Sequence, residues 1–482
     1  MRWLVVAGVV LVSCIIYALS SSPEAGFHDS AELALKASQP GATHSPGAPV
    51  HTLLGYGLIQ LLGDPALATN WLSILGGSLA AGVVCLMLLG MGANRIIAST
   101  GGLAFALSFH IWGNSVVTET YSLSIFFLGC SLLLGLYWRR SLDDRWLIAI
   151  AIVYGLALGA HFANIILLPA FIYLMIAGNS SWLRNTVVFA TIVALALMAI
   201  VAANVLLAAN AAPFGQATPD SLAGILFYMS GAEHAPLEVS GVGFYLGRIY
   251  EHLSIFSRHY FYVLLPVGIA GAYVLWRKDW VYAGFLALIF CLYMGYFTLF
   301  GAGDYFTMVV PAYLVFSVWV GIAVSGLLDR YPAGVGSYLA YIILPGAILL
   351  SLASQFPGRY ADAHSGRAAD FADQAFAILP DNGIVIAGWR EFTVLTYYQQ
   401  IHARRPDLTI ILPARTLRHY SHGNIQDYLA FIDAEICARP VATNKLPADL
   451  LSEYGVVSMD SDYNWHRVEV GSATEACQAQ AL

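Results

Sequence analysis

Residues 67–91 read LATNWLSILGGSLAAGVVCLMLLGM, a stretch without one charged side chain. About 20 helical residues, at ~1.5 Å each, cross the ~30 Å hydrocarbon core of a bilayer. The whole chain has the same character: of its 482 residues 59% are hydrophobic and 11% are charged, and the mean hydropathy is +0.69. Soluble proteins are about 45 to 50% apolar and about 25% charged. The sequence therefore predicts a polytopic α-helical membrane protein.

Apolar stretches of roughly spanning length recur along the chain. We expect about eleven transmembrane helices, at residues 3–19, 67–91, 96–112, 116–138, 146–161, 162–177, 182–208, 259–276, 280–300, 305–327 and 338–355. The continuous run from Trp146 to Ala177 would also fit one long tilted helix. Lys and Arg beside transmembrane spans tend to stay on the cytoplasmic side. If the run from Trp146 to Ala177 crosses the membrane twice, Arg184 and the later basic residues lie on the same cytoplasmic side as the earlier ones, whereas one crossing would place them outside.

Charge bias also predicts which loops face which side. With a cytoplasmic N-terminus, the inner loops carry Arg2, Arg95, Arg139, Arg140, Arg145, Arg184, Arg277, Lys278 and Arg330. The loops 20–66 and 209–258 and the tail then lie outside. The first stretch also resembles a cleavable signal peptide, since Arg2 precedes a short apolar core and Ala18-Leu19-Ser20 follows it. Cleavage would leave every later segment in place, so we expect an integral protein of the plasma or inner membrane in either case.

The tail differs from the rest of the chain. After a transmembrane domain over 1–356, we expect a soluble extracytoplasmic α/β domain over 357–482, because residues 383–387 and 408–412 have the pattern of short buried strands. Cys437 and Cys477 are the cysteines outside apolar spans. In an oxidising outer compartment they could pair, and the alternative is two free thiols.

Acidic residues stand out in the first outer loop, which contains Phe27-His28-Asp29-Ser30-Ala31-Glu32-Leu33. Asp29 and Glu32 are three residues apart, which places both carboxylates on one helical turn. A partly desolvated carboxylate at a membrane surface can act as a general base while its neighbour orients it or holds a substrate hydroxyl. The alternative is a helix cap, with Asp29 as N-cap and Glu32 as its N3 partner.

Further polar residues border the spans on the same predicted side. Glu119 and Tyr121 follow one span, His161 lies at a turn between two spans, and Asp304 follows another. Such residues face a cavity or a partner more often than lipid, although each alone could simply satisfy an interhelical hydrogen bond. Together with Asp29 they predict a polar outer cavity.

The order of these motifs resembles the protein O-mannosyltransferase-like, multi-pass family of the GT-C class of glycosyltransferases. The resemblance rests on Asp29-Ser-Ala-Glu32-Leu, His44-Ser-Pro-Gly-Ala-Pro, Trp112 followed by Glu119-Thr-Tyr121, Gly159-Ala-His161, and Arg405-Pro406-Asp407 before a strand. It implies inverting transfer of a hexose or mannose-type sugar from a polyprenyl-phosphate donor to a protein or glycan acceptor at the outer face. It also implies catalysis by an acidic residue at the position of Asp29, with Glu32, His44, Glu119, Tyr121 and His161 at other characteristic places.

The chemistry of such a reaction suggests roles for further residues. Asp29 would deprotonate the acceptor hydroxyl, and charge on the leaving phosphate would be stabilised by His44, His161 and the loop arginines Arg248 and Arg258. We also expect His51 in the donor or acceptor site. The two arginines could equally be solvated loop charges. His28, His44 and His51 with Asp29 could hold a divalent metal, but we expect no metal requirement, and no zinc or nucleotide-binding motif is present.

Some features depart from this family or leave other functions open. Ala31 stands where glycine is usual, Ser45 and Ala48 replace a proline and an aromatic residue, and Arg390-Glu391 replaces an Asp-Asn-like pair, so the sugar and acceptor stay undetermined. A secondary transporter or lipid flippase would use a similar cavity but would show paired broken helices in two halves. A receptor that uses the tail to bind a ligand would tolerate changes at Asp29. The formal net charge of -7 and the scattered Lys and Arg exclude a nucleic-acid partner.

Overall fold

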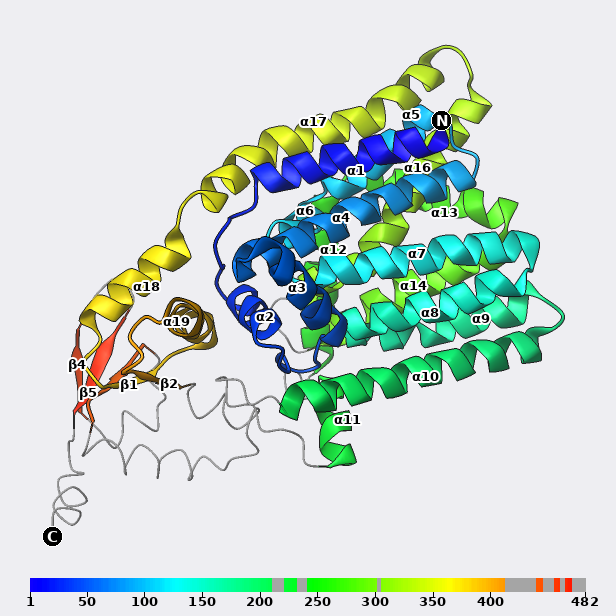
Figure 1. Ribbon diagram of the computed structural model, residues 1–482. Helices are drawn as coiled ribbons and strands as arrows, with labels where there is room; N and C mark the ends of the chain where they lie inside the picture. The colour runs from blue at the N-terminus through cyan, green and yellow to red at the C-terminus, as the bar shows by residue number, and fades with distance from the viewer. Residues whose placement is uncertain are drawn as a thin grey trace, which may run out of the picture.

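The computed structural model describes residues 1–209, 221–231, 241–300, 305–411, 439–444, 455–459 and 464–469. A bundle of long helices forms the body of the protein, and a small α/β domain lies beyond one end of it (Figure 1). The bundle contains α1 (Arg2–Leu19), α4 (Pro65–Gly90), α5 (Arg95–Ala106), α6 (Phe109–Ser115), α7 (Thr120–Ser141), α8 (Asp144–Ala160), α9 (Leu168–Gly178), α10 (Trp182–Ala209), α12 (Val242–His259), α13 (Leu264–Lys278), α14 (Trp280–Leu299), α15 (Tyr305–Met308), α16 (Val310–Arg330) and α17 (Val335–Ala363). This confirms the predicted class of fold.

The number of membrane crossings is less definite than the class. Seven helices among the described residues are long and apolar enough to span a bilayer, or nine if each of two bent pairs counts as one span. The bent pairs are α5 with α6, at 67°, and α12 with α13, at 92°. α8 has 17 residues, and the apolar segment Phe162–Gly178 is also shorter than a usual span. All eleven predicted stretches fall on helices, and eleven crossings remain a prediction.

The run from Trp146 to Ala177 folds back on itself at His161. His161 has an extended backbone (φ -155°, ψ 108°) that ends α8, and a short 3-10 helix, Phe162–Leu167, leads into α9. In one continuous helix Tyr154 and Phe171 would lie about 25 Å apart. Their ring centroids are 4.4 Å apart, which agrees with two helices rather than one.

Side chains that cap helices explain several of the helix starts. Asp64 accepts a hydrogen bond from the backbone of Leu67 ahead of Pro65, and Asn94 accepts one from Ile97. These bonds satisfy amide groups that have no partner inside a helix, and the proline needs none. The chain thus begins new helices where the apolar stretches begin.

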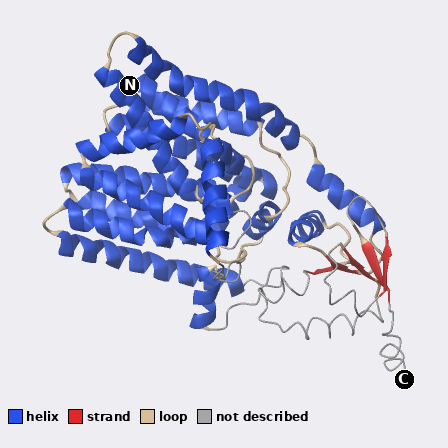
Figure 2. Cartoon of the chain, turned by 180° about the vertical axis from the view of Figure 1, so that it is seen from behind, coloured by secondary structure: helices blue, strands red, loops and turns tan. Residues whose placement is uncertain are grey.

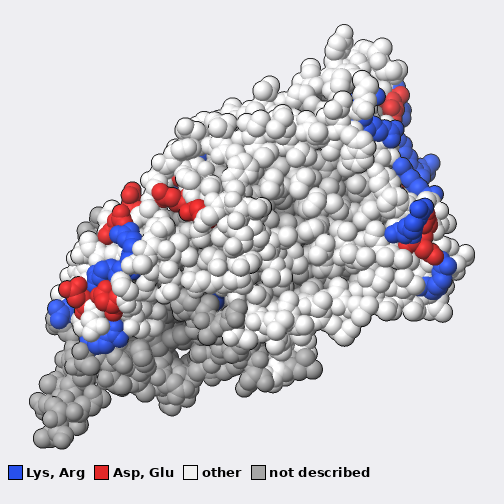
Figure 3. Space-filling view, in the orientation of Figure 1, with Lys and Arg blue, Asp and Glu red and all other residues white. Residues whose placement is uncertain are grey.

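Basic side chains gather at one end of the bundle (Figure 3). Contacts between loops agree with this: Arg139 lies 3.5 Å from Asp279, Arg184 donates to Asp144 at 2.8 Å, and Arg140 donates to the carbonyl of Gly90. The loops after α4, α7, α9 and α13 therefore share one end, as the charge bias predicts.

The tail forms the small α/β domain, whose strands match the predicted runs. It contains α18 (Arg367–Ile378), β1 (Ile384–Ile386), α19 (Trp389–His402), β2 (Thr409–Ile411), β3 (Val441–Thr443), β4 (Gly455–Ser458) and β5 (His466–Glu469). The sheet order is β2-β1-β3-β5-β4, with β1 parallel to β2 and β3 and the other pairs antiparallel. Figure 2 shows this sheet at the far end of the molecule from the bundle. Cys437 and Cys477 lie outside the described residues.

The segment between α1 and α4, predicted as the first outer loop, lies between the bundle and this domain. It contains α2 (Asp29–Ser38) and α3 (Pro49–Leu62). Ala34 and Leu35 of α2 share one buried apolar cluster with Phe371 of α18 and Leu395 of α19. α17 runs on to Ala363, so the predicted boundary at 356/357 falls inside this helix. Burial of this shared apolar surface fixes the domain against α2.

Candidate active site

The carboxylates of Asp29 and Glu32 do not cap α2. Asp29 is the first residue of the helix, His28 precedes it as N-cap with φ at 58°, and no side chain makes a capping hydrogen bond. The cap interpretation is therefore wrong. Both carboxylates turn instead to partners far away in the sequence.

Glu32 is fully buried and holds His44. One of its oxygens accepts a hydrogen bond from the backbone N–H of His44 at 2.6 Å, and the other lies 2.5 Å from Nδ1 of the ring. Burial disfavours the charged imidazolium, but the charges of Asp29, Glu32 and Glu119 and the hydrogen bond to Glu32 outweigh it and raise the pKa of His44 to about 10. His44 is therefore a cation near neutral pH.

Asp29 lies on the other side of this cation and stays accessible. Its Oδ2 is 3.5 Å from Nε2 of His44, and 31% of its side chain is exposed. Its Oδ1 accepts a hydrogen bond of 2.7 Å from the indole N–H of Trp389, the first residue of α19. Trp389 also packs edge-on against the His44 ring at 5.7 Å. The α/β domain thus contributes directly to the cluster.

Trp389 was not predicted from the sequence, although its position carries a signal. It follows the carboxyl end of β1, which lies between the parallel strands β2 and β3. The chain continues from β1 to its neighbour β2 on one side, whereas β3, on the other side, has β5 as its next neighbour in the opposite direction. Ligands bind at such a switch point in open α/β sheets. The backbone N–H of Gly388 donates to the side-chain oxygen of Asn444, which follows β3. This bond joins the chain ends of β1 and β3 next to Trp389.

The turn that carries His44 is fixed against α10 and α11 (Leu222–Ser230). The Tyr228 hydroxyl donates to the carbonyl of Thr43, and Ser45 donates to the carbonyl of Tyr228. Gly47 has φ at +81°, and a Cβ there would lie 2.6 Å from the amide oxygen of Asn204. Glycine tolerates the positive φ and has no Cβ to collide with Asn204, which explains the glycine in the Pro-Gly turn after His44.

Glu119, Tyr121 and His161, which were predicted farther along the chain, belong to the bundle and lie near Asp29, Glu32 and His44. Ser73 of α4 holds Glu119 by accepting from its backbone N–H at 3.0 Å and donating to its carbonyl, and the charge of Glu119 acts on His44. The rings of Tyr121 and His161 meet edge-on at 5.1 Å, and His44 acts electrostatically on His161. The structure therefore brings Asp29, Glu32, His44, Glu119, Tyr121 and His161 into one neighbourhood.

Four other predicted residues are not placed in this cluster by the described contacts. His51 is fully buried in α3, and neither ring nitrogen has a hydrogen-bond partner. Arg248 lies in α12 and donates to the carbonyl of Phe300, and Arg258 is exposed near the end of α12. Asp304 lies outside the described residues.

Asp29, Glu32 and His44 also form a candidate ligand set for a metal. One donor atom from each lies within 4.8 Å of the others, and two carboxylates with one imidazole suit a divalent cation. This set replaces the predicted one, because Glu32 rather than His28 or His51 completes it. A bound cation would have to displace the proton that His44 holds between the carboxylates.

Known proteins resemble this chain in sequence over one part and in fold over nearly all of it. Residues 29–184 match the family model described as the protein O-mannosyl-transferase TMEM260 N-terminal domain. Protein O-mannosyl-transferase tmem260 of Dictyostelium discoideum is 21% identical over 83% of this chain. The chain spans 56% of the length of that relative.

The fold is shared with a protein of known structure. ArnT from Cupriavidus metallidurans superposes with a TM-score of 0.59 in the apo state and in the state bound to undecaprenyl phosphate. In both cases the likeness covers 96% of this chain and 97% of the other, at 13% identity. The family match begins at Asp29 itself. The resemblance that the motifs indicate is therefore confirmed: the chain is similar to protein O-mannosyltransferase-like, multi-pass proteins and has a GT-C-like fold.

Proposed function

We propose that this protein is a membrane glycosyltransferase that moves a mannose-type sugar from a polyprenyl-phosphate donor to a hydroxyl of a protein or glycan acceptor. The observation that carries the proposal is the Asp29 carboxylate, which is exposed on one side and held on the other by His44 and Trp389. The similarity to O-mannosyltransferases and to the ArnT fold supports the choice of reaction.

Asp29 acts as the general base in this proposal. It accepts the proton of the acceptor hydroxyl while that oxygen bonds to the anomeric carbon, and the carrier phosphate departs with the electron pair of the broken bond. A single displacement of this kind inverts the anomeric configuration. The His44 cation lies beside Asp29, and Glu32 positions His44, because its buried carboxylate accepts from the backbone N–H of His44 and contacts its ring.

Glu119, Tyr121 and His161 form the bundle side of the proposed substrate cavity. Tyr121 and His161 can donate hydrogen bonds to sugar hydroxyls or to the departing phosphate, whose charge must be stabilised. No metal has a step in this scheme, because the imidazolium already supplies a positive charge between the carboxylates. The predicted roles of Arg248, Arg258 and Asp304 in donor binding remain proposals.

The side of the membrane also belongs to the proposal. The end of the bundle that gathers Arg139, Arg140, Arg184 and the other basic residues faces the cytoplasm by the positive-inside rule. Asp29 and the tail domain then lie outside, where the carrier keeps its chain in the bilayer and the acceptor arrives from water. The tail domain closes the site through Trp389.

Transfer assays test the proposal directly. Purified protein in lipid nanodiscs is incubated with a panel of radiolabelled polyprenyl-phosphate sugars and acceptor peptides, and both carrier turnover and labelled acceptor are measured. Transfer from one donor is expected. Asp29→Asn keeps an oxygen for the Trp389 bond but cannot act as a base, so it should lose about 10²- to 10⁴-fold in rate.

The matched control is Asp329→Asn, which makes the same change at an exposed carboxylate near the end of α16. It should transfer at the wild-type rate. Near-full transfer by Asp29→Asn would show that another group is the base, and Glu32→Gln would then be tested. Absence of transfer with every donor, combined with movement of the donor lipid across the bilayer of proteoliposomes, would instead favour a flippase.

A further inference from the structure

Arg359, near the end of α17, is a partly buried cation that makes no ion pair with a carboxylate of the described residues. Its Nη2 donates to the carbonyl of Phe109 at 2.8 Å and to the Gln355 side chain at 3.0 Å. Its Nε is buried without a hydrogen-bond partner, and no carboxylate of the described residues lies within ion-pair distance of it. A desolvated guanidinium beside the membrane favours an anionic ligand, because burying an unpaired charge is costly.

The surroundings of Arg359 hold the guanidinium in place. Its central carbon lies 5.2 Å from the ring centroid of Phe109 and 5.5 Å from that of Trp112. Gly113 leaves room beside it, since a Cβ at that position would come within 3.3 Å of Nη1. Two aromatic faces and two acceptors thus fix the side chain and leave part of its donor edge unused.

An open groove with a cavity volume of about 260 Å³ reaches Arg359. It runs between the end of α1, at Ser20 and Ser22, and the junction of α17 with α18. Phe27, two residues before Asp29, also lines it, so the groove adjoins the candidate active site.

Two carboxylates line the groove as well. Asp362 is paired with Arg367 at 3.0 Å and acts on Arg359 from beyond ion-pair distance, and Glu24 makes no ion pair with Arg359 among the described residues. Arg359 is therefore the lining cation without an ion pair in the part of the chain that the structure describes.

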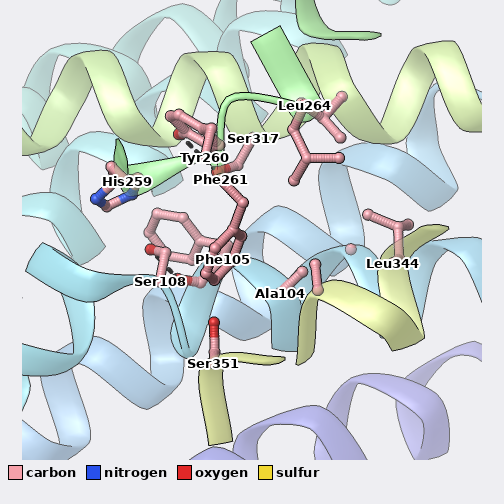
Figure 4. A pocket seen from close by; sticks show the side chains of 13 residues that line it. Ala104, Phe105, Ser108, His259, Tyr260, Phe261, Leu264, Ser317, Leu344 and Ser351 are labelled. Carbon is pink, nitrogen blue, oxygen red and sulfur yellow. Dashed lines mark hydrogen bonds between the residues drawn. The ribbon is translucent and has the colours of Figure 1, made fainter. Parts of the chain in front are cut away.

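One face of α17 connects Arg359 with an apolar pocket deeper in the bundle. Leu344, Ala347 and Ser351 line this pocket, and Gln355 and Arg359 continue the same three- and four-residue spacing towards the groove. Figure 4 shows the pocket, with Phe105, Ser108, Tyr260, Leu264, Leu344 and Ser351 around it. Its cavity volume is about 20 Å³, the space of about one water molecule, so it is too small for a hydrocarbon chain. Other apolar side chains of α17, Ile342, Leu349 and Leu350, are exposed on the surface of the bundle.

We propose that Arg359 binds the phosphate of a polyprenyl phosphate whose chain lies along the exposed apolar side chains of α17. The guanidinium suits a phosphate monoester, and Ile342, Leu349 and Leu350 suit a branched hydrocarbon. The choice of a polyprenyl carrier rests on the proposed function. In the reaction the site retains the carrier after the sugar has left.

Binding of farnesyl phosphate to the full-length protein in nanodiscs, without any sugar donor, tests this site. Arg359→Gln should weaken binding by at least about tenfold, since charge-assisted hydrogen bonds are the strong class. Arg359→Lys, which keeps a point charge, should restore part of the affinity. Arg277→Gln, which removes an exposed arginine outside the groove, is the control and should bind as the wild type does. Leu349→Asn, which makes the exposed face of α17 more polar, should weaken binding of farnesyl phosphate but not of inorganic phosphate.

The outcomes separate this site from the proposed function, because binding is read without transfer. Equal binding by Arg359→Gln with an unchanged melting temperature would overturn the assignment of the phosphate. Displacement by an equal concentration of phosphatidylglycerol would show a general phospholipid site instead of a polyprenyl site. Inorganic phosphate that binds as tightly as farnesyl phosphate would overturn the assignment of the chain to the apolar face of α17.

Discussion

Two histidines of the segment between α1 and α4 lie seven residues apart and have opposite environments. His44 lies in a turn between Glu32 and Asp29, and its pKa is raised to about 10 because those carboxylates outweigh the cost of burial. His51 lies in α3 without a hydrogen-bond partner, and burial lowers its pKa to about 4. One ring is therefore charged near neutral pH and the other is neutral.

The comparison shows that the partners of a histidine, rather than its place in a motif, decide its chemistry. Both residues belong to the same His-rich loop, and both were expected near substrate. Only His44 meets carboxylates, because α2 turns Asp29 and Glu32 towards it. The His51 side chain is fully buried, and its ring nitrogens make no hydrogen bond to the described residues.

The largest expected effect comes from removing the cation of the pair. His44→Gln leaves the fully buried Glu32 without its charged partner, and breaking a buried ion pair in this way costs about 3 to 5 kcal/mol of stability. A clear drop in melting temperature in nanodiscs is expected. His28→Gln, at an exposed neighbour, should change stability by less than about 0.5 kcal/mol. Equal melting of both variants would mean that His44 is not charged in the folded protein.

The pH dependence of this pair sharpens the comparison. The pKa of His44 in the folded protein, about 10, exceeds its unfolded value of about 6.5, so its stabilisation is complete below about pH 6.5 and is lost as the pH rises towards 10. The gap in melting temperature between wild type and His44→Gln should therefore narrow over this window. Lys36, whose pKa burial lowers to about 8, titrates in both proteins. A constant gap would contradict the charged state of His44.

Trp389 should have a smaller effect that appears in turnover. Trp389→Phe keeps an aromatic ring against His44 but removes the N–H bond to Asp29, and a hydrogen bond to a charged group contributes about 1.5 to 3 kcal/mol. At saturating donor, kcat should fall about ten- to a hundredfold, with KM for the donor unchanged. Trp276→Phe, an exposed residue of α13, is the control. A rise in KM without loss of kcat would mean that Trp389 binds substrate rather than positioning Asp29.

The smallest effect is expected at His51. His51→Leu removes an unpartnered polar ring of similar volume, so transfer at pH 7 should stay within about twofold and stability should be equal or slightly higher. The pKa of His51 in the folded protein is below its unfolded value, so the wild type loses stability as the pH falls below about 6.5. The variant should therefore melt higher than wild type at pH 5. A large loss of transfer would place His51 back among the substrate-binding residues.

Local pattern was sufficient to predict much of the fold. Apolar runs placed the long helices, and the charge of Arg184 predicted the chain reversal at His161 that the Tyr154 and Phe171 contact supports. The short strands after Gly383 and Leu408 were also predicted. The bends after Ala106 and His259 were not, because sequence spacing does not show where packing against other helices interrupts a helix.

The candidate site was predictable only in its local part. Asp29 and Glu32 share one turn, so spacing paired them correctly, but their true partners, His44 and Trp389, are set by a Pro-Gly turn and by a separate domain. Nothing in a single sequence relates position 29 to position 389. The unpaired charge of Arg359 was equally hidden, since pairing of an arginine is decided by which acidic side chains the fold brings near it.

α17 links the bilayer to the chemistry at Asp29. Its 29 residues make a rod of about 44 Å, whereas the hydrocarbon core is about 30 Å thick, and it continues towards the domain that carries Trp389. Pro345 and Pro357 interrupt its hydrogen bonds at two levels. The hydrocarbon core therefore covers only part of this helix. The part of α17 beyond the core connects the membrane bundle to the domain whose indole meets the Asp29 carboxylate.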